Sequence, residues 1–241
     1  MNSLPGLGKT KAYIDVEANF FPSQPSPFPH VEDGPFITVS RQAGTGGSTL
    51  ANALVRELES REKGDSPPWT VFDSEVVQQM LTEANLPSRL ARFLPEDRIP
   101  AVVAAVGEVV GLHPNLWTLV ARTNETVKRL AMLGHAVIVG RGGNFATERV
   151  ANGLDIRLVG SETTRAMRTA QAQGCTVLEA TLLNRKIDNA RRDYVQAAFD
   201  RDINDTTAYD LVFNIDTFST AEAVDATLAV LARRHLVPSR T

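Results

Sequence analysis

Five short apolar runs of three to six residues alternate with longer segments of helical pattern from residue 36 onward. The runs are rich in β-branched residues, which is typical of strands buried on both faces of a parallel sheet. Strands separated by helices form βαβ units, whose crossovers place helices on both faces of the sheet. The chain is therefore predicted to be an α/β protein with a parallel sheet. The predicted strands are Phe36–Ser40, Thr70–Phe72, Ala136–Gly140, Leu154–Val159 and Asp210–Ile215.

Helical patterns fill the intervals between these runs. Residues Ser48–Arg61 place apolar side chains at helical spacing, and two later segments, beginning at Thr176 and Ser219, open with a hydroxyl cap followed three residues later by a glutamate. The interval 74–133 is much longer than the others, and four prolines divide it into several helices. Such an insertion is expected to build a substrate-binding lobe over the carboxyl edge of the sheet.

Residues 1–34 differ from the rest of the chain, because prolines recur every two or three positions between Pro22 and Pro29. We interpret them as an extended or disordered arm in front of one domain that spans residues 35–241. The arm contains Gly-Leu-Gly-Lys-Thr at residues 6–10, which matches the end of a Walker A phosphate-binding motif. Ser3 stands where that motif needs a glycine, and no strand pattern precedes it, so we reject the match.

The composition excludes several classes of function. The 25 basic and 28 acidic residues give a formal net charge of −3, which offers no general attraction to nucleic acid or to an anionic membrane. No apolar run approaches the roughly 20 residues that span a bilayer, and the N-terminus lacks a secretory pattern. The single cysteine, Cys175, excludes an internal disulfide and a cysteine-based zinc site. We therefore expect a cytoplasmic protein without nucleic-acid or membrane partners, and the sequence does not indicate its oligomeric state.

The sharpest local signal follows the first predicted strand, where a glycine-rich turn leads directly into a helix. In that context successive backbone N–H groups converge on an anion, assisted by the helix N-terminus. Ser48 or Thr49 could also offer a hydroxyl to Mg²⁺. The alternative is a tight turn whose glycines serve packing alone. The candidate phosphate-binding residues are Gly44, Thr45, Gly46, Gly47, Ser48 and Thr49.

Two more candidates follow the second and third predicted strands, at the same edge of the sheet. Arg141 lies between glycines, where its guanidinium would point into the cleft and bind phosphate. A surface arginine in a loop is the alternative. Asp73 follows the second predicted strand directly. It could act as a base, as a carboxylate beside a metal or as a contact to a ribose, and the alternative is a plain helix cap, for which Ser74 competes.

Arginines gather in the two helices that follow the fourth strand, although the chain is acidic overall. Arg165 and Arg168 lie three residues apart in the first helix. In the second helix Arg185, Asp188 and Arg191 recur every three residues along one face, so the aspartate can hold the two arginines apart and oriented. Phosphoryl transfer needs such cations, because negative charge spreads over the oxygens of the transferred group. A solvated, salt-bridged helix face is the alternative.

Six motifs, taken in this order, resemble the cytidylate kinase-like family of P-loop kinases, relatives of the bacterial CMP kinases. The similarity covers about residues 36–232. The motifs are Ile37–Ala51 (ITVSRQAGTGGSTLA), Phe72-Asp73, Val137–Gly143 (VIVGRGG), Ile156–Arg168 (IRLVGSETTRAMR), Asp188–Asp202 (DNARRDYVQAAFDRD) and Tyr209–Asp216 (YDLVFNID).

The resemblance implies a P-loop kinase three-layer fold: a five-stranded parallel sheet with helices on both faces, a helical insertion at about 74–133 that binds the nucleoside monophosphate, and a lid at about 174–200. It implies transfer of the γ-phosphoryl group of ATP to a nucleoside monophosphate such as CMP or dCMP, with Mg²⁺ bridging the phosphates. Small-molecule nucleotides are the implied partners.

The resemblance also assigns roles by position. The turn from Gly44 to Thr49 would cradle the ATP phosphates, and Asp73 and Arg141 would face the acceptor. Arg191 would act from the lid. Its catalytic companions would be Arg185 or Arg192, and the residues that orient the lid would be Asp188, Arg165 and Arg168.

Two residues of the CMP kinases are replaced in this chain. Their P-loop lysine is Gly47, and their Gly-Arg-Asp motif ends at Gly142, without a carboxylate that helps to hold Mg²⁺. Both changes look like a property of the cytidylate kinase-like group. Loss of such a cation usually costs several kcal/mol of transition-state stabilisation. We therefore hypothesise that Arg41, at the entry to the turn, acts in catalysis by replacing the missing charge.

Two other functions remain open from the sequence. The chain could be a nucleotide-binding module that senses ATP without catalysis, which the missing lysine and aspartate favour and the arginine cluster disfavours. It could also be a kinase for a non-nucleotide acceptor, because the long helical insertion could form an unrelated pocket.

Overall fold

The computed structural model describes residues 34–61, 67–73 and 114–238. Five parallel strands form one sheet in the order β2-β3-β1-β4-β5, so the chain crosses from β1 to the β2 edge and returns through β3 before adding β4 and β5. This confirms the predicted five-stranded parallel sheet. The strands are β1 (Phe36–Arg41), β2 (Thr70–Phe72), β3 (Ala136–Val139), β4 (Gly153–Val159) and β5 (Leu211–Asn214).

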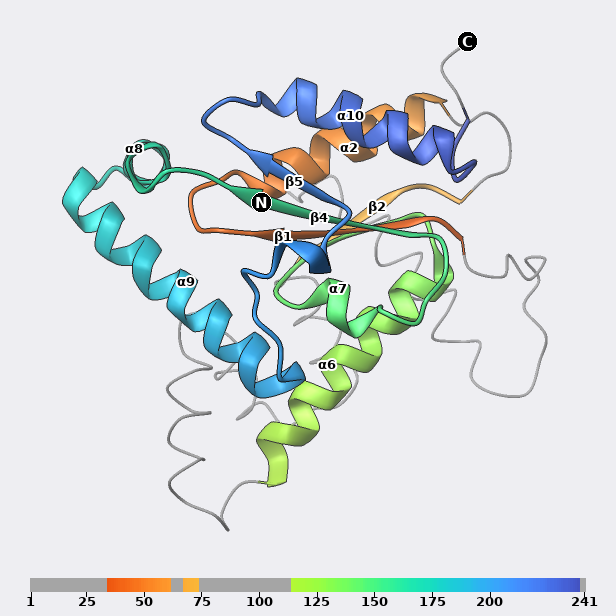
Figure 1. Cartoon of the computed structure of the whole chain (residues 1–241), viewed down its shortest axis with the longest axis horizontal. Helices are drawn as coiled ribbons and strands as arrows, with labels where there is room; N and C mark the ends of the chain where they lie inside the picture. Colours follow the sequence, from red (N-terminus) through yellow and green to blue (C-terminus); the bar gives the residue numbers. More distant parts are fainter. Residues whose placement is uncertain (1–33, 62–66, 74–113, 239–241) are drawn as a thin grey trace, which may run out of the picture.

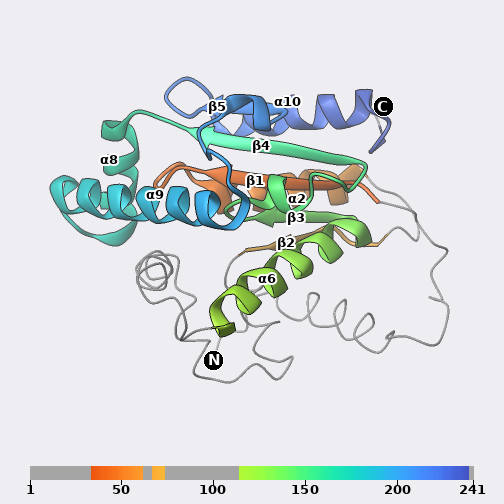
Figure 2. The ribbon, with the colours of Figure 1, turned by 60° about the horizontal axis from the view of Figure 1, so that its bottom comes forward.

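Helices cover both faces of the sheet, which gives the predicted three layers (Figures 1 and 2). On one face lie α2 (Gly47–Arg61) and α10 (Thr220–Arg233). On the other face lie α6 (Pro114–Leu133), the short α7 (Gly143–Ala146) and α9 (Val177–Phe199). The helix α8 (Glu162–Gln173) lies at the carboxyl end of β4, against the first turns of α9, and a 3-10 helix (Thr206–Ala208) precedes β5.

The strand sequences explain the two layers of core. Because successive side chains of a strand point to opposite faces, alternate residues of β1 divide between two hydrophobic clusters. Ile37 and Val39 pack with Leu54 of α2 and Leu228 of α10. Phe36 belongs to the cluster on the opposite face, under α6 and α9. Both clusters consist of side chains with almost no exposed surface, so the sheet is buried on both faces as the β-branched runs predict.

Local sequence signals place the helix ends correctly. The hydroxyls of Thr176 and Ser219 accept hydrogen bonds from the backbone N–H groups of Glu179 and Glu222, respectively. In return, each glutamate carboxylate accepts from the backbone N–H of its cap residue. Both predicted capping boxes are therefore confirmed. The residues expected to form the lid, 174–200, include all of α9, which runs without interruption along one side of the molecule.

Several predictions fall outside the described residues. The arm at 1–34 lies there almost entirely, and so does the first two-thirds of the helical insertion, residues 74–113. None of the helices in the described ranges has the length and hydropathy that a transmembrane helix requires.

The face of the sheet under α7 includes polar side chains, among them the buried Thr38 and the partly buried Asp155. The carboxyl of Asp155 accepts a hydrogen bond of 2.5 Å from the hydroxyl of Thr38, and burial raises the pKa of Asp155 from 3.8 to about 6. Since the folded state binds this proton more tightly than the unfolded chain, its contribution to stability is present below pH 4 and is lost as the pH rises through 6.

We therefore expect Asp155→Asn, which keeps the acceptor for Thr38, to raise the free energy of unfolding by about 3 kcal/mol at pH 7.5 and by only about 0.5 kcal/mol at pH 4. Urea unfolding of both proteins at the two pH values measures this gap. An equal gap at both pH values, or a variant less stable than the wild type at pH 7.5, would show that the carboxyl is not held protonated by burial.

Candidate functional site

The glycine-rich turn joins the end of β1 to the start of α2, at the carboxyl edge of the central strand. Gly44 and Gly46 have φ of 77° and 84°, values that residues with a Cβ rarely adopt. A Cβ on Gly44 would also lie 2.4 Å from the backbone oxygen of Arg165 in α8. The sequence therefore needs glycine here both for the turn and for the close approach of α8.

The turn leaves a run of backbone donors unused. Within the described part of the chain, no acceptor is bound by the backbone N–H groups of residues 44–49, whereas those of Ala43 and Leu50 on either side are both occupied. Consecutive N–H groups at a helix N-terminus are a binding site for an anion. This geometry is the one that the phosphate interpretation of the turn requires.

The hydroxyls of the turn differ in their availability. Thr45 is buried, and its hydroxyl donates to the backbone oxygen of Gln42 at 2.7 Å, so its side chain stabilises the turn itself. Ser48 and Thr49 are exposed in the first turn of α2. Either hydroxyl would be available to a Mg²⁺ ion held mainly by nucleotide phosphates, since Mg²⁺ sites of this kind need few protein ligands. The described residues contain no cluster of three acidic, histidine or cysteine side chains that would hold a metal alone.

Arg41 occupies the space beside Gly47. A Cβ on Gly47 would lie 3.1 Å from the Cγ and 3.3 Å from the Cδ of Arg41. The stem of Arg41 therefore packs against the point at which a side chain on residue 47 would begin, and a larger residue at position 47 requires Arg41 to shift by a few tenths of an ångström. The residues at positions 41 and 47 are thus coupled by packing.

Asp188 and Arg165 hold the turn from α9 and α8. One oxygen of the Asp188 carboxylate accepts from the backbone N–H of Ala43 at 2.7 Å, and the other accepts from Arg165 at 2.7 Å. Arg165 is 7% exposed, and it also donates to the backbone oxygens of Ala43 and Gly160. This charged pair fixes the entry to the turn, and the Nε and Nη1 donors of Arg165 are engaged by the protein.

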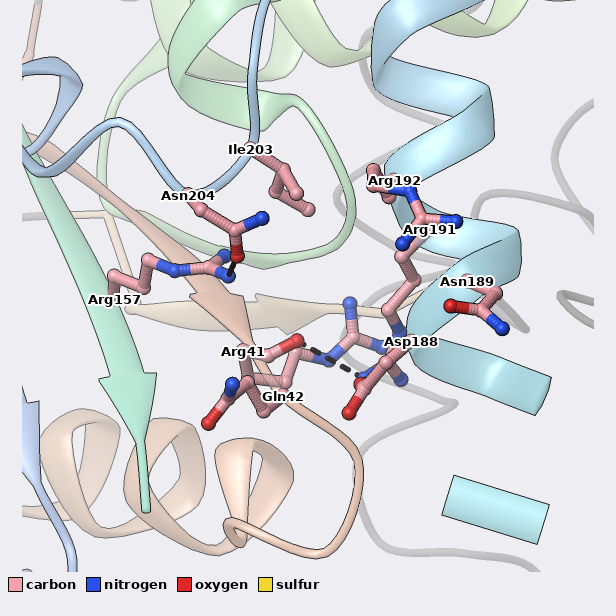
Figure 3. A pocket seen from close by; sticks show the side chains of 9 residues that line it. All are labelled: Arg41, Gln42, Arg157, Asp188, Asn189, Arg191, Arg192, Ile203 and Asn204. Atoms are coloured by element: carbon pink, nitrogen blue, oxygen red, sulfur yellow. Dashed lines mark hydrogen bonds and ion pairs between the residues drawn. The ribbon is translucent and has the colours of Figure 1, made fainter. Parts of the chain in front are cut away.

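Arg191 reaches the same turn one helical turn later. It is 7% exposed, donates to the backbone oxygen of Arg41 at 3.0 Å, and lies 3.9 Å from the Asp188 carboxylate. With Arg192 it borders a cavity of about 120 Å³ between α9 and the sheet (Figure 3). The described residues that line this cavity are Arg41, Gln42, Arg157, Asp188, Asn189, Arg191, Arg192, Ile203 and Asn204.

The structure separates Arg185 from the other predicted lid residues. Although Arg185 and Asp188 lie three residues apart, Arg185 forms a two-point ion pair with Glu162 of α8, at 2.5 and 2.8 Å. Both partners are exposed, and the pair lowers the pKa of Glu162 and raises the pKa of Arg185. The carboxylate of Asp188 binds Arg165 instead, because α8 packs across the same face of α9.

Arg168 lies over the other side of the turn. Its Nη2 atom would be 3.2 Å from a Cβ on Gly46. Together with Thr45 and Gly46 it lines a small cavity of about 20 Å³ that is closed by apolar residues after β5, among them Phe218. An arginine and apolar side chains beside a phosphate cradle can bind the base of a nucleotide.

Asp73 and Arg141 lie at the carboxyl ends of β2 and β3, which pair in register. The guanidinium carbon of Arg141 lies 4.2 Å above the ring of Tyr194 in α9. Burial raises the pKa of Tyr194, whose hydroxyl donates to Asn124 of α6 at 3.2 Å. The cation–π contact directs Arg141 toward α9, on the same side of the sheet as Arg191.

Sequence reasoning missed Arg157, a cation in the middle of β4. It is 3% exposed and lies in the wall of the cavity beside Arg191 (Figure 3). An arginine within a buried strand was the available signal, because such a strand accepts a charge only where polar groups or a ligand meet it.

Comparison with known proteins shows the family of the chain and its fold. The model of the cytidylate kinase-like family matches residues 36–217, which confirms the family predicted from the sequence. A search of curated proteins gives no significant match. Among solved structures, an uncharacterized protein from Eubacterium ventriosum has a TM-score of 0.61 at 16% identity, covering 83% of this chain and 98% of that one, which shows a shared fold.

Two kinases are also among the similar structures. A shikimate kinase from Bacteroides thetaiotaomicron has a TM-score of 0.45 at 16% identity, covering 82% of this chain and 98% of the other. A gluconokinase from Sinorhizobium meliloti has a TM-score of 0.46 at 16% identity, covering 84% of this chain and 93% of the other.

Proposed function

This chain belongs to the cytidylate kinase-like family, a family of kinase-like phosphotransferases, and we propose that it transfers the γ-phosphoryl group of Mg·ATP to a nucleoside monophosphate such as CMP or dCMP. The observation that carries the proposal is the turn at residues 44–49, whose run of N–H donors has no acceptor among the described residues and lies between arginines on two sides. Its partners would be small molecules in the cytoplasm.

The donor nucleotide would bind across the turn. The backbone N–H groups of residues 44–49 would bind the β- and γ-phosphates, and the hydroxyl of Ser48 or Thr49 would complete the shell of Mg²⁺. The base would lie near Arg168 and Phe218, beside a cavity that is too small to enclose it. Arg168, beside Gly46, is positioned to contact the phosphates from the α8 side.

The acceptor would bind on the opposite side of the turn, between α9 and the sheet. Asp73 and Arg141 at the ends of β2 and β3 would face it, and Arg191 would neutralise charge on the transferred group. Arg191 is a strong candidate because its guanidinium is already fixed against the backbone of the turn. Arg41 would supply the positive charge that a P-loop lysine provides elsewhere.

The test is ADP formation from Mg·ATP with CMP, dCMP, UMP, AMP and GMP offered in turn. We expect acceptor-dependent ADP release with at least one pyrimidine monophosphate, and we expect Arg191→Ala to lower it by about 10²-fold or more. Arg201→Ala, which breaks only an exposed ion pair with Glu148, is the matched control and should leave the rate unchanged.

Other outcomes would favour the remaining candidates. ATP binding by calorimetry without turnover of any nucleotide would contradict the proposed acceptor and favour a nucleotide sensor or a kinase for a non-nucleotide molecule. The sensor hypothesis rests on Gly47 and Gly142, which stand where CMP kinases have a lysine and an aspartate. Absence of both binding and turnover would mean that the glycines serve the turn alone.

A further inference from the structure

Arg157 is a buried cation without an anionic partner in the described part of the chain. Its guanidinium donates to the hydroxyl of Ser40 at 2.9 Å, to that of Tyr209 at 3.5 Å and to the amide oxygen of Asn204 at 3.0 Å. All three acceptors are neutral. A guanidinium that is 3% exposed ordinarily needs a carboxylate or another anion to offset its lost hydration.

The donors that remain on Arg157 match an oxyanion. A guanidinium has five N–H groups, and the three hydrogen bonds leave from its two terminal nitrogens. The Nε–H and one Nη2–H therefore have no acceptor among the described residues. Such donors on a planar fork bind phosphate or carboxylate oxygens with charge-assisted hydrogen bonds.

The cavity beside Arg157 carries an excess of positive charge. Four arginines line its walls, against one carboxylate, Asp188, which Arg165 and the N–H of Ala43 already engage. Figure 3 shows the guanidinium of Arg157 extending from β4 toward the middle of the cavity, with Arg191 on α9 across from it. A bound anion would offset this charge.

This cavity is separate from the nucleotide side of the turn. It shares no lining residue with the small cavity between Arg168 and Phe218, and residues 41–46 pass between the two. A phosphate bound at Arg157 would therefore occupy a different pocket from a nucleotide base that lies beside Arg168.

We propose that Arg157, with Arg191 and Arg192, forms an anion subsite that binds a phosphate group of the acceptor on the α9 side of the glycine-rich turn. The statement that this phosphate belongs to the acceptor rests on the proposed phosphoryl transfer. The existence of the anion subsite does not depend on it. Arg157 is thus a specificity-determining residue that selects phosphorylated acceptors over neutral ones.

Calorimetric titration with inorganic phosphate tests the subsite without turnover. The titration is made with phosphate alone and again in the presence of Mg²⁺ and a non-hydrolysable ATP analogue, and phosphate should bind the wild type in both. Arg157→Met should weaken the affinity for phosphate at least tenfold and change the affinity for the analogue less than threefold. Arg168→Ala should instead weaken the affinity for the analogue and leave the affinity for phosphate within threefold. Arg201→Met, on an exposed ion pair, is the control for loss of one positive charge.

Two results would overturn the proposal: a wild type that does not bind phosphate at millimolar concentration, or an Arg157→Met variant that binds it as the wild type does. Arg192→Met, at an exposed position of the same cavity, is the second variant should Arg157→Met fold poorly, and it should weaken phosphate several-fold.

Turnover then identifies the source of the phosphate. With an active acceptor, Arg157→Met should raise the KM for that acceptor at least tenfold and leave the KM for ATP within threefold, and equal effects on both would assign the phosphate to ATP and contradict the proposal. If no acceptor is turned over, the proposed function fails, yet the phosphate titrations still decide whether the subsite exists.

Discussion

Arg41→Ala is expected to lower kcat/KM for phosphoryl transfer by about 10²–10³-fold, the loss that follows removal of one preorganised donor at a reacting group. The reason is structural: the stem of Arg41 lies against Gly47, at the position from which a P-loop lysine would extend over the turn. Steady-state kinetics with the active acceptor measures the loss, and calorimetry with ATP separates binding from chemistry.

Exchange of the two residues gives a sharper test of the same idea. The double change Arg41→Gly with Gly47→Lys restores the Walker A spacing and removes the side chain that packs against position 47. We expect it to be at least tenfold more active than Arg41→Gly alone. Gly47→Lys alone should be less active than the double variant, because its Cβ would lie 3.1 Å from the Cγ of Arg41 and the two side chains would compete for one place. A double variant no better than Arg41→Gly, or an Arg41→Ala protein with normal turnover, would refute the replacement.

Asp188→Ala is expected to destabilise the protein by about 3 kcal/mol, since it leaves the buried guanidinium of Arg165 without its carboxylate and the N–H of Ala43 without its acceptor. The same change frees the entry to the turn, so ATP should bind more weakly. Urea unfolding and calorimetry measure the two effects. Asp188→Asn keeps an acceptor for Ala43 but not the charge, and it should be intermediate.

The matched control for Asp188 is Glu162→Ala. Glu162 also binds an arginine with both carboxylate oxygens, but its pair with Arg185 lies at the surface, where water and salt screen it. We expect no measurable change in stability. If Asp188→Ala were as mild as Glu162→Ala, the carboxylate would not be what fixes the turn to α8 and α9.

Most of the fold could be predicted because its signals are local. The five strands were readable as β-branched runs, with ends within one residue of the observed ones, and the capping boxes at Thr176 and Ser219 involve residues only three apart. The family follows from the same motifs, since they retain their order along residues 36–217.

The site was less predictable because its partners come from different elements. The spacing of Arg185 and Asp188 suggested a pair within one helix, whereas packing of α8 on α9 gives Asp188 to Arg165 and Arg185 to Glu162. Gly47 looked like a missing lysine, and only the fold shows that the stem of Arg41 packs against it. Arg157 was readable as a charge within a strand, but sequence alone does not show that its position borders a cavity.

The central claim is that this chain moves a phosphoryl group from ATP to a second molecule, and transfer of label from [γ-³²P]ATP tests it most directly. The account predicts that the label appears in a phosphorylated acceptor, with CMP or dCMP among the best, and that Arg41→Ala and Arg191→Ala both suppress its appearance. Label that stays in ATP, or that is released only as inorganic phosphate whatever acceptor is offered, would contradict it.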